Sequence, residues 1–160
     1  MKIHTDAFRV RQGDEVNLNK RPTIVDPVYK SKADYKKLLA YHVAQLSDQQ
    51  QLFYGSNREA VLLVFQAMDA AGKDGAIRHV MSGVNPQDCQ VFSFNHPSTA
   101  DLEHDFLWRT TRDLPGRGRI GIFNRSYCEE VLIVRVHHDL LEAEGLADAP
   151  RDDKALWHDR

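Results

Sequence analysis

The chain has 160 residues, a length that suits one domain, and 42% of them are hydrophobic, which supplies a packed core and excludes wholesale disorder. Its 21 basic and 23 acidic residues give a net charge of -2, so we expect neither nucleic acid nor a membrane surface as a partner. The longest apolar run, 61–65, is far too short to span a bilayer, and no secretory apolar segment occupies the N-terminus. Cys89 and Cys128 lack the spacing of a zinc site, which favours a reduced, cytoplasmic protein.

The first predicted helix follows a polar stretch. Residues 1–30 are polar and contain Gly13, Pro22 and Pro27, so we expect an irregular N-terminal arm ahead of a single domain at 31–160. Ser31 precedes Asp34 by three positions, as in a capping box. No glycine or proline intervenes from there to Gly55, and apolar residues recur at helical spacing, which predicts one long amphipathic helix.

Three short apolar segments alternate with helical patterns in the rest of the chain. The strands are predicted at 60–65, 90–94 and 119–123. The helices are predicted at 73–82, 98–113 (with Ser98 as N-cap) and 126–136. The first strand is continuously apolar, which is typical of a parallel strand buried on both faces. Alternating strands and helices predict an α/β fold with a parallel sheet and right-handed crossovers, and the charged stretch 142–160 is expected to be a connection.

The turn between the first strand and its helix, 67–75, has the character of a phosphate-binding loop. Gly72 and Lys73 match the template G-x-x-x-x-G-K-[ST], whereas Ala67 and Asp74 do not. Such a turn aims backbone N–H groups at one point beside the positive end of a helix. A tight strand-to-helix connection with surface acids is the competing interpretation. The predicted phosphate-binding residues are Ala70, Ala71, Gly72, Lys73, Asp74 and Gly75.

The two acids of this turn predict a metal ion. Asp69 and Asp74 would repel a bound phosphate unless a cation lay between them. Mg²⁺ is the expected ion, because it accepts carboxylate and phosphate oxygens together with water. Asp69 is the better candidate ligand, since it lies inside the turn and not on the helix.

A second group of candidate site residues follows the third strand. Asn124 and Arg125 fall at its carboxyl end, where open α/β sheets collect ligands. Arg125 can bind phosphate through two N–H groups, and Asn124 can orient a phosphate or a metal-bound water. The alternative is a helix cap in which Asn124 or Ser126 precedes Glu129 and Glu130 in the first turn.

Four blocks of sequence closely resemble the polyphosphate kinase 2 family: 64–80, 83–87, 104–109 and 121–127. The likeness begins near Tyr29 and continues to the last residue. It implies a P-loop NTPase-like, three-layer parallel sheet with flanking helices, and Mg²⁺-dependent transfer of a phosphoryl group between inorganic polyphosphate and AMP or ADP. By position, the resemblance implies that Asp69 holds the metal, Lys73 and its neighbouring amides hold the phosphates, and Asn124 and Arg125 act on the reacting groups.

The resemblance also implies more chain than is present. The family continues with further strands and a mobile lid, so we expect this sequence to be the N-terminal part of the domain, with the C-terminal strands and lid missing and its catalytic competence reduced. Strand 60–65 would then form a bare apolar edge, which predicts poor solubility or a homo-oligomer.

Two other functions stay open at this point. An ATP-dependent P-loop small-molecule kinase would be favoured by glycine at 67 and serine or threonine at 74, and both are absent. A non-catalytic remnant that only binds phosphate is the third interpretation. An acceptor phosphate is already ionised near neutral pH, so the lack of an obvious general base is compatible with phosphoryl transfer.

Overall fold

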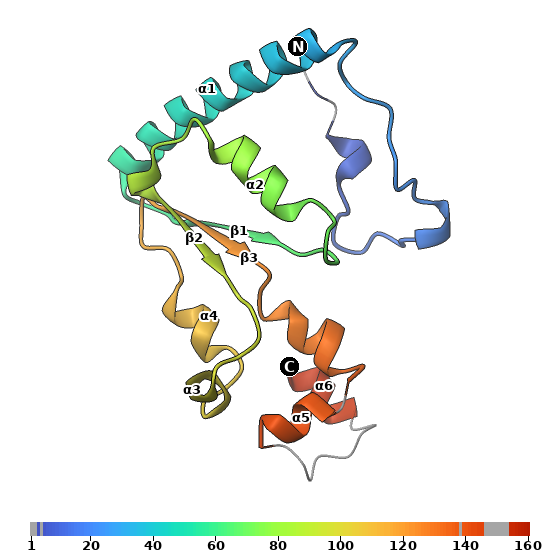
Figure 1. The fold of residues 1–160 in the computed structure, drawn as a ribbon. Helices are drawn as coiled ribbons and strands as arrows, with labels where there is room; N and C mark the ends of the chain where they lie inside the picture. The colour runs from blue at the N-terminus through green and yellow to red at the C-terminus, as the bar shows by residue number, and fades with distance from the viewer. Residues whose placement is uncertain (1–2, 4, 138, 146–153) are drawn as a thin grey trace. The chain divides into compact units, whose positions relative to one another are not determined.

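The computed structural model describes residues 3, 5–137, 139–145 and 154–160 (Figure 1). The chain divides into two compact units, Met1–His42 and Val43–Arg160. In the described part of the chain, no helix combines the length and the apolar character that crossing a membrane requires.

The N-terminal unit is mostly irregular before its helix. It contains two short 3-10 turns, η1 (Asp6–Phe8) and η2 (Leu18–Lys20), and the first part of helix α1 (Lys32–Ser56). The backbone N–H of Asp34 donates to Ser31 Oγ at 3.1 Å, which confirms the predicted cap at the start of α1. Asp34 Oδ2 accepts from the N–H of Lys30 at 2.9 Å, so the reciprocal contact of the box reaches one residue further back than predicted.

Three parallel strands form the sheet of the second unit, in the order β1-β3-β2. They are β1 (Val61–Phe65), β2 (Cys89–Ser93) and β3 (Ile120–Asn124). Phe65 and Ser93 both pair with Asn124, so all three strands end at the same edge of the sheet. The structure thus confirms the parallel α/β prediction, and it places the segments that follow β1, β2 and β3 next to one another.

The core lies on both faces of β3, the central strand. Ile120 and Ile122 point to one face, where Ile77 of helix α2 (Lys73–Met81) packs against them. Phe123 points to the other face and is fully buried, with the Phe94 ring centroid 4.8 Å away. Figure 1 shows α2 on one side of the sheet and the helices that follow β2 on the other. The arrangement is the three-layer architecture that the resemblance implied.

Strand β1 differs from its prediction. Val61, Leu63 and Val64 keep 38–39% of their surface exposed, so the expectation that 60–65 is buried on both faces is wrong. The physical reason is position in the sheet: β1 pairs only with β3 in the described structure, and an edge strand receives less cover. The expectation of an apolar edge strand at this position is confirmed.

The helix predicted at 98–113 begins as expected. Helix α3 (Thr99–Leu102) has a complete capping box, in which Ser98 Oγ accepts from the N–H of Asp101 and the Asp101 carboxylate accepts from the N–H of Ser98. Hydrogen bonds from the backbone and side chain of Ser98 lower the pKa of the Asp101 carboxyl group.

The same predicted helix is interrupted halfway. Helix α4 (Trp108–Arg112) is separate from α3, because Asp105 starts a new turn between them. Asp105 Oδ1 accepts from the N–H of Leu107 at 2.9 Å, and the Asp105 backbone carbonyl accepts from the N–H of Trp108 at 2.8 Å. An aspartate that binds the backbone two residues ahead competes with the continuous helix that apolar periodicity predicts.

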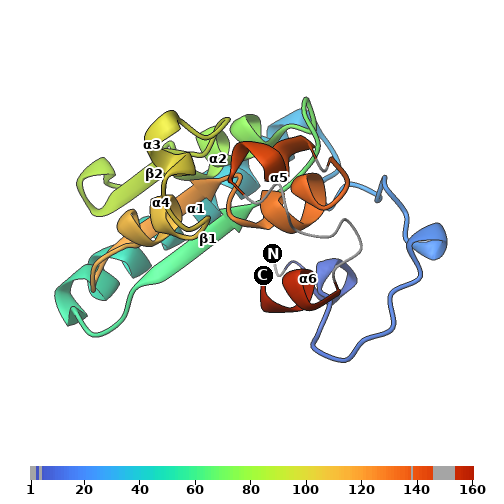
Figure 2. The same cartoon turned by 90° about the horizontal axis from the view of Figure 1, so that it is seen from below.

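The segments after β3 are more structured than predicted. The helix expected at 126–136 contains a π-helical turn, η4 (Glu130–Val134), and α5 (Asp139–Ala143) packs beside it (Figure 2). Helix α6 (Lys154–Asp159) lies within the stretch expected to be a connection, of which 146–153 fall outside the described residues. Arg160 follows α6 and joins two acids at 3.3 and 2.6 Å, which are Glu130 and Glu144.

Candidate active site

A cavity of about 320 Å³ opens at the edge where β1, β2 and β3 end. The structure therefore brings both predicted groups of site residues to one place. Gly75, in the first turn of α2, is the one predicted site residue that is not among those lining the cavity. The lining residues are Asp69, Ala70, Ala71, Gly72, Lys73, Asp74, Ser93, Asn95, Asn124 and Arg125.

The loop after β1 is bent by two residues in the left-handed region. Gly72 has φ +90° immediately before α2, a conformation that favours glycine, and Ala70 has φ +60°. The bend points the start of α2 toward the cavity. Ala76 donates its N–H to Gly72 O at 3.0 Å in the first helical hydrogen bond, so the amides ahead of it have no partner within the helix. These amides form the kind of N-terminal turn that binds anions.

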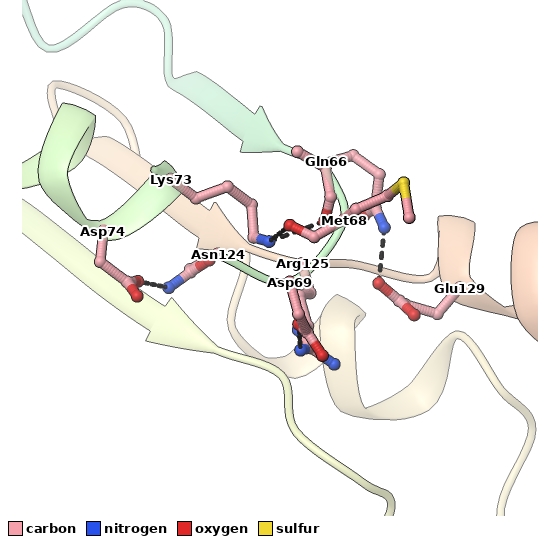
Figure 3. A network of polar contacts seen from close by, with 9 residues as sticks. Gln66, Met68, Asp69, Lys73, Asp74, Asn124, Arg125 and Glu129 are labelled. Atoms are coloured by element: carbon pink, nitrogen blue, oxygen red, sulfur yellow. Dashed lines mark hydrogen bonds and ion pairs between the residues drawn. The ribbon is translucent and has the colours of Figure 1, made fainter. Parts of the chain in front are cut away.

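Lys73 lies on the first turn of α2, and its side chain bends back over the loop (Figure 3). Its Nζ donates to the backbone carbonyls of Ala67 at 2.7 Å and Met68 at 3.0 Å. An ammonium group has three N–H donors, so one donor is left for a ligand while the other two brace the loop.

Asn124 connects the end of β3 to the start of α2. Its Nδ2 donates to Asp74 Oδ1 at 2.6 Å. The amide oxygen of the same side chain, Asn124 Oδ1, is buried and has no hydrogen-bond partner among the described residues. A buried amide oxygen without a partner is costly, and a ligand or metal ion at this point would satisfy it.

Arg125 is held in a conformation that is uncommon for arginine. Its φ is +67°, and its backbone N–H donates to Phe65 O at 2.9 Å. Its Nη2 forms an ion pair with the Asp69 carboxylate, whose side chain is 83% exposed. Each acid of the loop therefore has a protein partner: the Arg125 guanidinium for Asp69 and the Asn124 amide for Asp74.

A sequence model described as Polyphosphate kinase 2 matches residues 29–153. The chain belongs to the polyphosphate kinase 2 family. The predicted family is thereby confirmed, as is the predicted start of the resemblance near Tyr29.

Relatives in this family carry names that state their substrates. An ADP-polyphosphate phosphotransferase from Rhodopseudomonas palustris is 66% identical over all 160 residues, which cover 55% of that protein. An AMP/ADP-polyphosphate phosphotransferase from Meiothermus ruber is 49% identical over 92 residues, which cover 58% of this chain and 34% of the relative. The crystal structure of polyphosphate kinase 2 from Arthrobacter aurescens aligns with a TM-score of 0.72 and 37% identity, over 89% of this chain and 52% of that one. This chain thus spans about half the length of the first and third of these proteins.

The donor atoms in the cavity of this polyphosphate kinase 2 chain fit Mg²⁺. Asp69 and Asp74 offer carboxylate oxygens, and Asn124 Oδ1 is a buried oxygen in need of a partner. Among the residues that the structure describes, no group of three or more histidines, cysteines or acids is arranged to hold a metal ion. An ion here would accordingly share its coordination with phosphate oxygens and water, as Mg²⁺ commonly does.

Two residues that line the cavity are not among the predicted site residues. Ser93 ends β2 in register with Asn124, and Asn95 follows two positions later. The carbonyl of Asn95 accepts from Nη1 of the buried Arg109 at 2.8 Å, which supports this segment from behind. Ser93 and Asn95 both lie at the carboxyl end of the second parallel strand, where the rule that ligands collect at strand ends also predicts site residues.

Proposed function

We propose that this chain carries the phosphate-binding part of an enzyme that transfers a phosphoryl group between inorganic polyphosphate and AMP or ADP, with Mg²⁺ as cofactor. One observation carries the proposal. A single cavity joins the N-terminal turn of α2, Lys73, Asn124 and Arg125 at the carboxyl ends of three parallel strands. The names of the family relatives support polyphosphate as the donor and AMP or ADP as the acceptor.

In this proposal the loop of residues 70–75 binds the phosphate chain. The unpaired amides of the first turn of α2 donate to phosphate oxygens, and the third N–H of Lys73 adds a positive charge. Gly75, in the first turn of α2, has no side chain and can contribute only its backbone N–H.

Asp69 is the proposed metal ligand, and Arg125 changes partner when substrate binds. Bound Mg²⁺ would neutralise phosphate charge and orient the oxygens for in-line transfer. Because the Asp69–Arg125 pair is exposed, it contributes about 1 kcal/mol or less and is easily exchanged. Arg125 then places its guanidinium on the transferred phosphoryl group, where charge develops in the transition state.

Asn124 acts between the two substrates in this scheme. Its Nδ2 stays on Asp74, and its unpartnered Oδ1 orients the metal ion or a water bound to it. An ionised acceptor phosphate needs no strong general base, so positioning and charge stabilisation supply the catalysis.

The test uses two forms of the protein. The first is the 160-residue chain, and the second is a fusion protein in which this chain replaces the matching residues of the Rhodopseudomonas palustris relative. Each is incubated with Mg²⁺, AMP or ADP, and either polyphosphate or ATP. The proposal predicts turnover with polyphosphate in the fusion and lower turnover in the chain alone. Turnover with ATP only, or binding without turnover in both forms, would overturn it in favour of an ATP-dependent kinase or a non-catalytic remnant.

The cytoplasmic location and the homo-oligomeric state predicted from the sequence belong to the same proposal. Exposed apolar side chains on β1 support self-association.

A further inference from the structure

One hydrogen bond outside the residues assigned above joins the two loops that form the cavity. Gln66 is the first residue after β1, and its Nε2 donates to Glu129 Oε1 at 2.5 Å (Figure 3). Gln66 opens the loop that carries Asp69, while Glu129 lies one helical turn beyond Arg125. This Gln66–Glu129 bridge thus connects the two segments whose charged side chains line the cavity.

The chemistry of the bridge determines which way the amide points. Both side chains are half-buried, and Gln66 Oε1 is buried without a hydrogen-bond partner among the described residues. Turning the amide over would place that oxygen against the Glu129 carboxylate and would remove the hydrogen bond. A hydrogen bond from an amide to an ionised carboxylate is about twice as strong as one between neutral groups. Gln66 therefore directs its Nε2 at Glu129, in the segment after β3, and leaves its own Oε1 without a partner among the described residues.

Arg125 needs such support because its other restraints are few. Its φ of +67° lies in the left-handed region, which is strained for an arginine. Its backbone is held to β1 by the hydrogen bond to Phe65 O, and its side chain is held by the exposed Asp69. When Asp69 and Arg125 exchange partners on substrate binding, two side-chain links between these segments stay in place: the Asn124–Asp74 hydrogen bond on one side of Arg125 in the sequence and the Gln66–Glu129 bridge on the other.

We propose that Gln66 and Glu129 are positioning residues, which keep Arg125 aligned with the phosphate-binding loop while it contacts the transferred phosphoryl group. This inference rests on the proposed function. Loss of the bridge should lower kcat roughly 10- to 100-fold, the effect of misplacing a charged group by about 1 Å, and should leave KM for the nucleotide little changed.

The test exchanges the two partners in the active fusion protein. Gln66→Glu places two carboxylates against each other, so its kcat should fall by the whole of that roughly 10- to 100-fold decrease. The double variant Gln66→Glu with Glu129→Gln rebuilds the bridge with donor and acceptor reversed, and its kcat should return to within about 3-fold of the original, a difference of less than about 1 kcal/mol. Gln51→Glu, at an exposed position of α1, adds the same charge elsewhere and is the matched control.

Several results would overturn the inference. Gln66→Glu could lower kcat no more than the Gln51→Glu control does, or the double variant could fold with an unchanged Tm and stay as slow as Gln66→Glu. A third contrary result would be equal effects of Gln66→Glu in the original protein and in an Arg125→Lys background, because a residue that acts through Arg125 must lose its effect when Arg125 is replaced.

A binding measurement separates this inference from the proposed function. Affinity for Mg²⁺-tripolyphosphate, measured by calorimetry on the 160-residue chain, should fall with Gln66→Glu and recover in the double variant. If the fusion shows no polyphosphate turnover but binding follows this order, the proposed reaction fails and the bridge stands. If binding is equal in all variants and kcat of the fusion is also unchanged, the bridge has no role in the site.

Discussion

The buried acid Glu130 makes the stability of this chain depend on pH in a defined direction. It begins η4, is 4% exposed, and lies among charged groups from three other segments: Glu144 of the α5 end, Arg160 after α6, and Arg109 of α4. The pKa of Glu130 is raised from its ordinary value of 4.5 to about 7, mainly by burial and in addition by the Glu144 side chain. Arg160 and Arg109 oppose the rise. We expect a Glu130→Gln variant to remove this titration.

The sign follows from the two pKa values. Between pH 4.5 and about 7 the folded chain holds a proton on Glu130 that the unfolded chain has released. The stabilisation from that proton is complete below pH 4.5 and is lost as pH rises through about 7. The difference corresponds to about 3 kcal/mol as an upper value, against a typical free energy of unfolding of about 5–15 kcal/mol. The Glu130→Gln side chain would stay a neutral hydrogen-bonding group at all pH values, although it would lose the ionic part of the Arg160 contact.

Urea unfolding at about pH 5 and about pH 8 measures this effect. The original chain should lose about 1–3 kcal/mol more than Glu130→Gln between the two pH values. Glu103→Gln, at an exposed position, is the matched control and should follow the original chain. The same pH dependence in all three proteins would refute the reasoning, because it would mean that Glu130 is ionised in the folded chain throughout this range.

Three further predictions concern the loop and the sheet edge. Lys73→Ala should abolish turnover and weaken Mg²⁺-polyphosphate binding, whereas Lys154→Ala at an exposed position of α6 should do neither; an unchanged rate in Lys73→Ala would remove the site assignment. Gly72→Ala should lower the free energy of unfolding by about 1–2 kcal/mol, because φ is +90° there, while Gly75→Ala in the first turn of α2 should raise it by about 0.5–1 kcal/mol; thermal melts check both, and the reverse order would contradict the loop geometry. Leu63→Lys should reduce concentration-dependent association in size-exclusion chromatography, because it places a charge on the exposed apolar edge of β1. A compact monomer of the original chain at every concentration would show that this edge does not cause self-association.

Local signals predicted the elements that depend on few neighbouring residues. The Ser98–Asp101 box and the start of α1 at Ser31 were found because a cap involves residues within about one turn. The position of the phosphate-binding turn was also predictable, since Gly72 and Lys73 follow directly after a strongly apolar strand. Helix 98–113 was predicted as one element because the turn at Asp105 uses a side-chain hydrogen bond that apolar periodicity does not reveal.

The sequence by itself determined the α/β class, the parallel strands, the family and the position of the candidate phosphate-binding turn, because each of these depends on short segments of contiguous chain. Tertiary structure alone decided the Asp69–Arg125 pair and the Gln66–Glu129 bridge. The partners in those two contacts lie 56 and 63 positions apart, so they meet only after the β1–β3 pairing has aligned the strand ends. The sequence states the charge and size of each side chain, whereas the pairing of the strands determines which side chains come into contact.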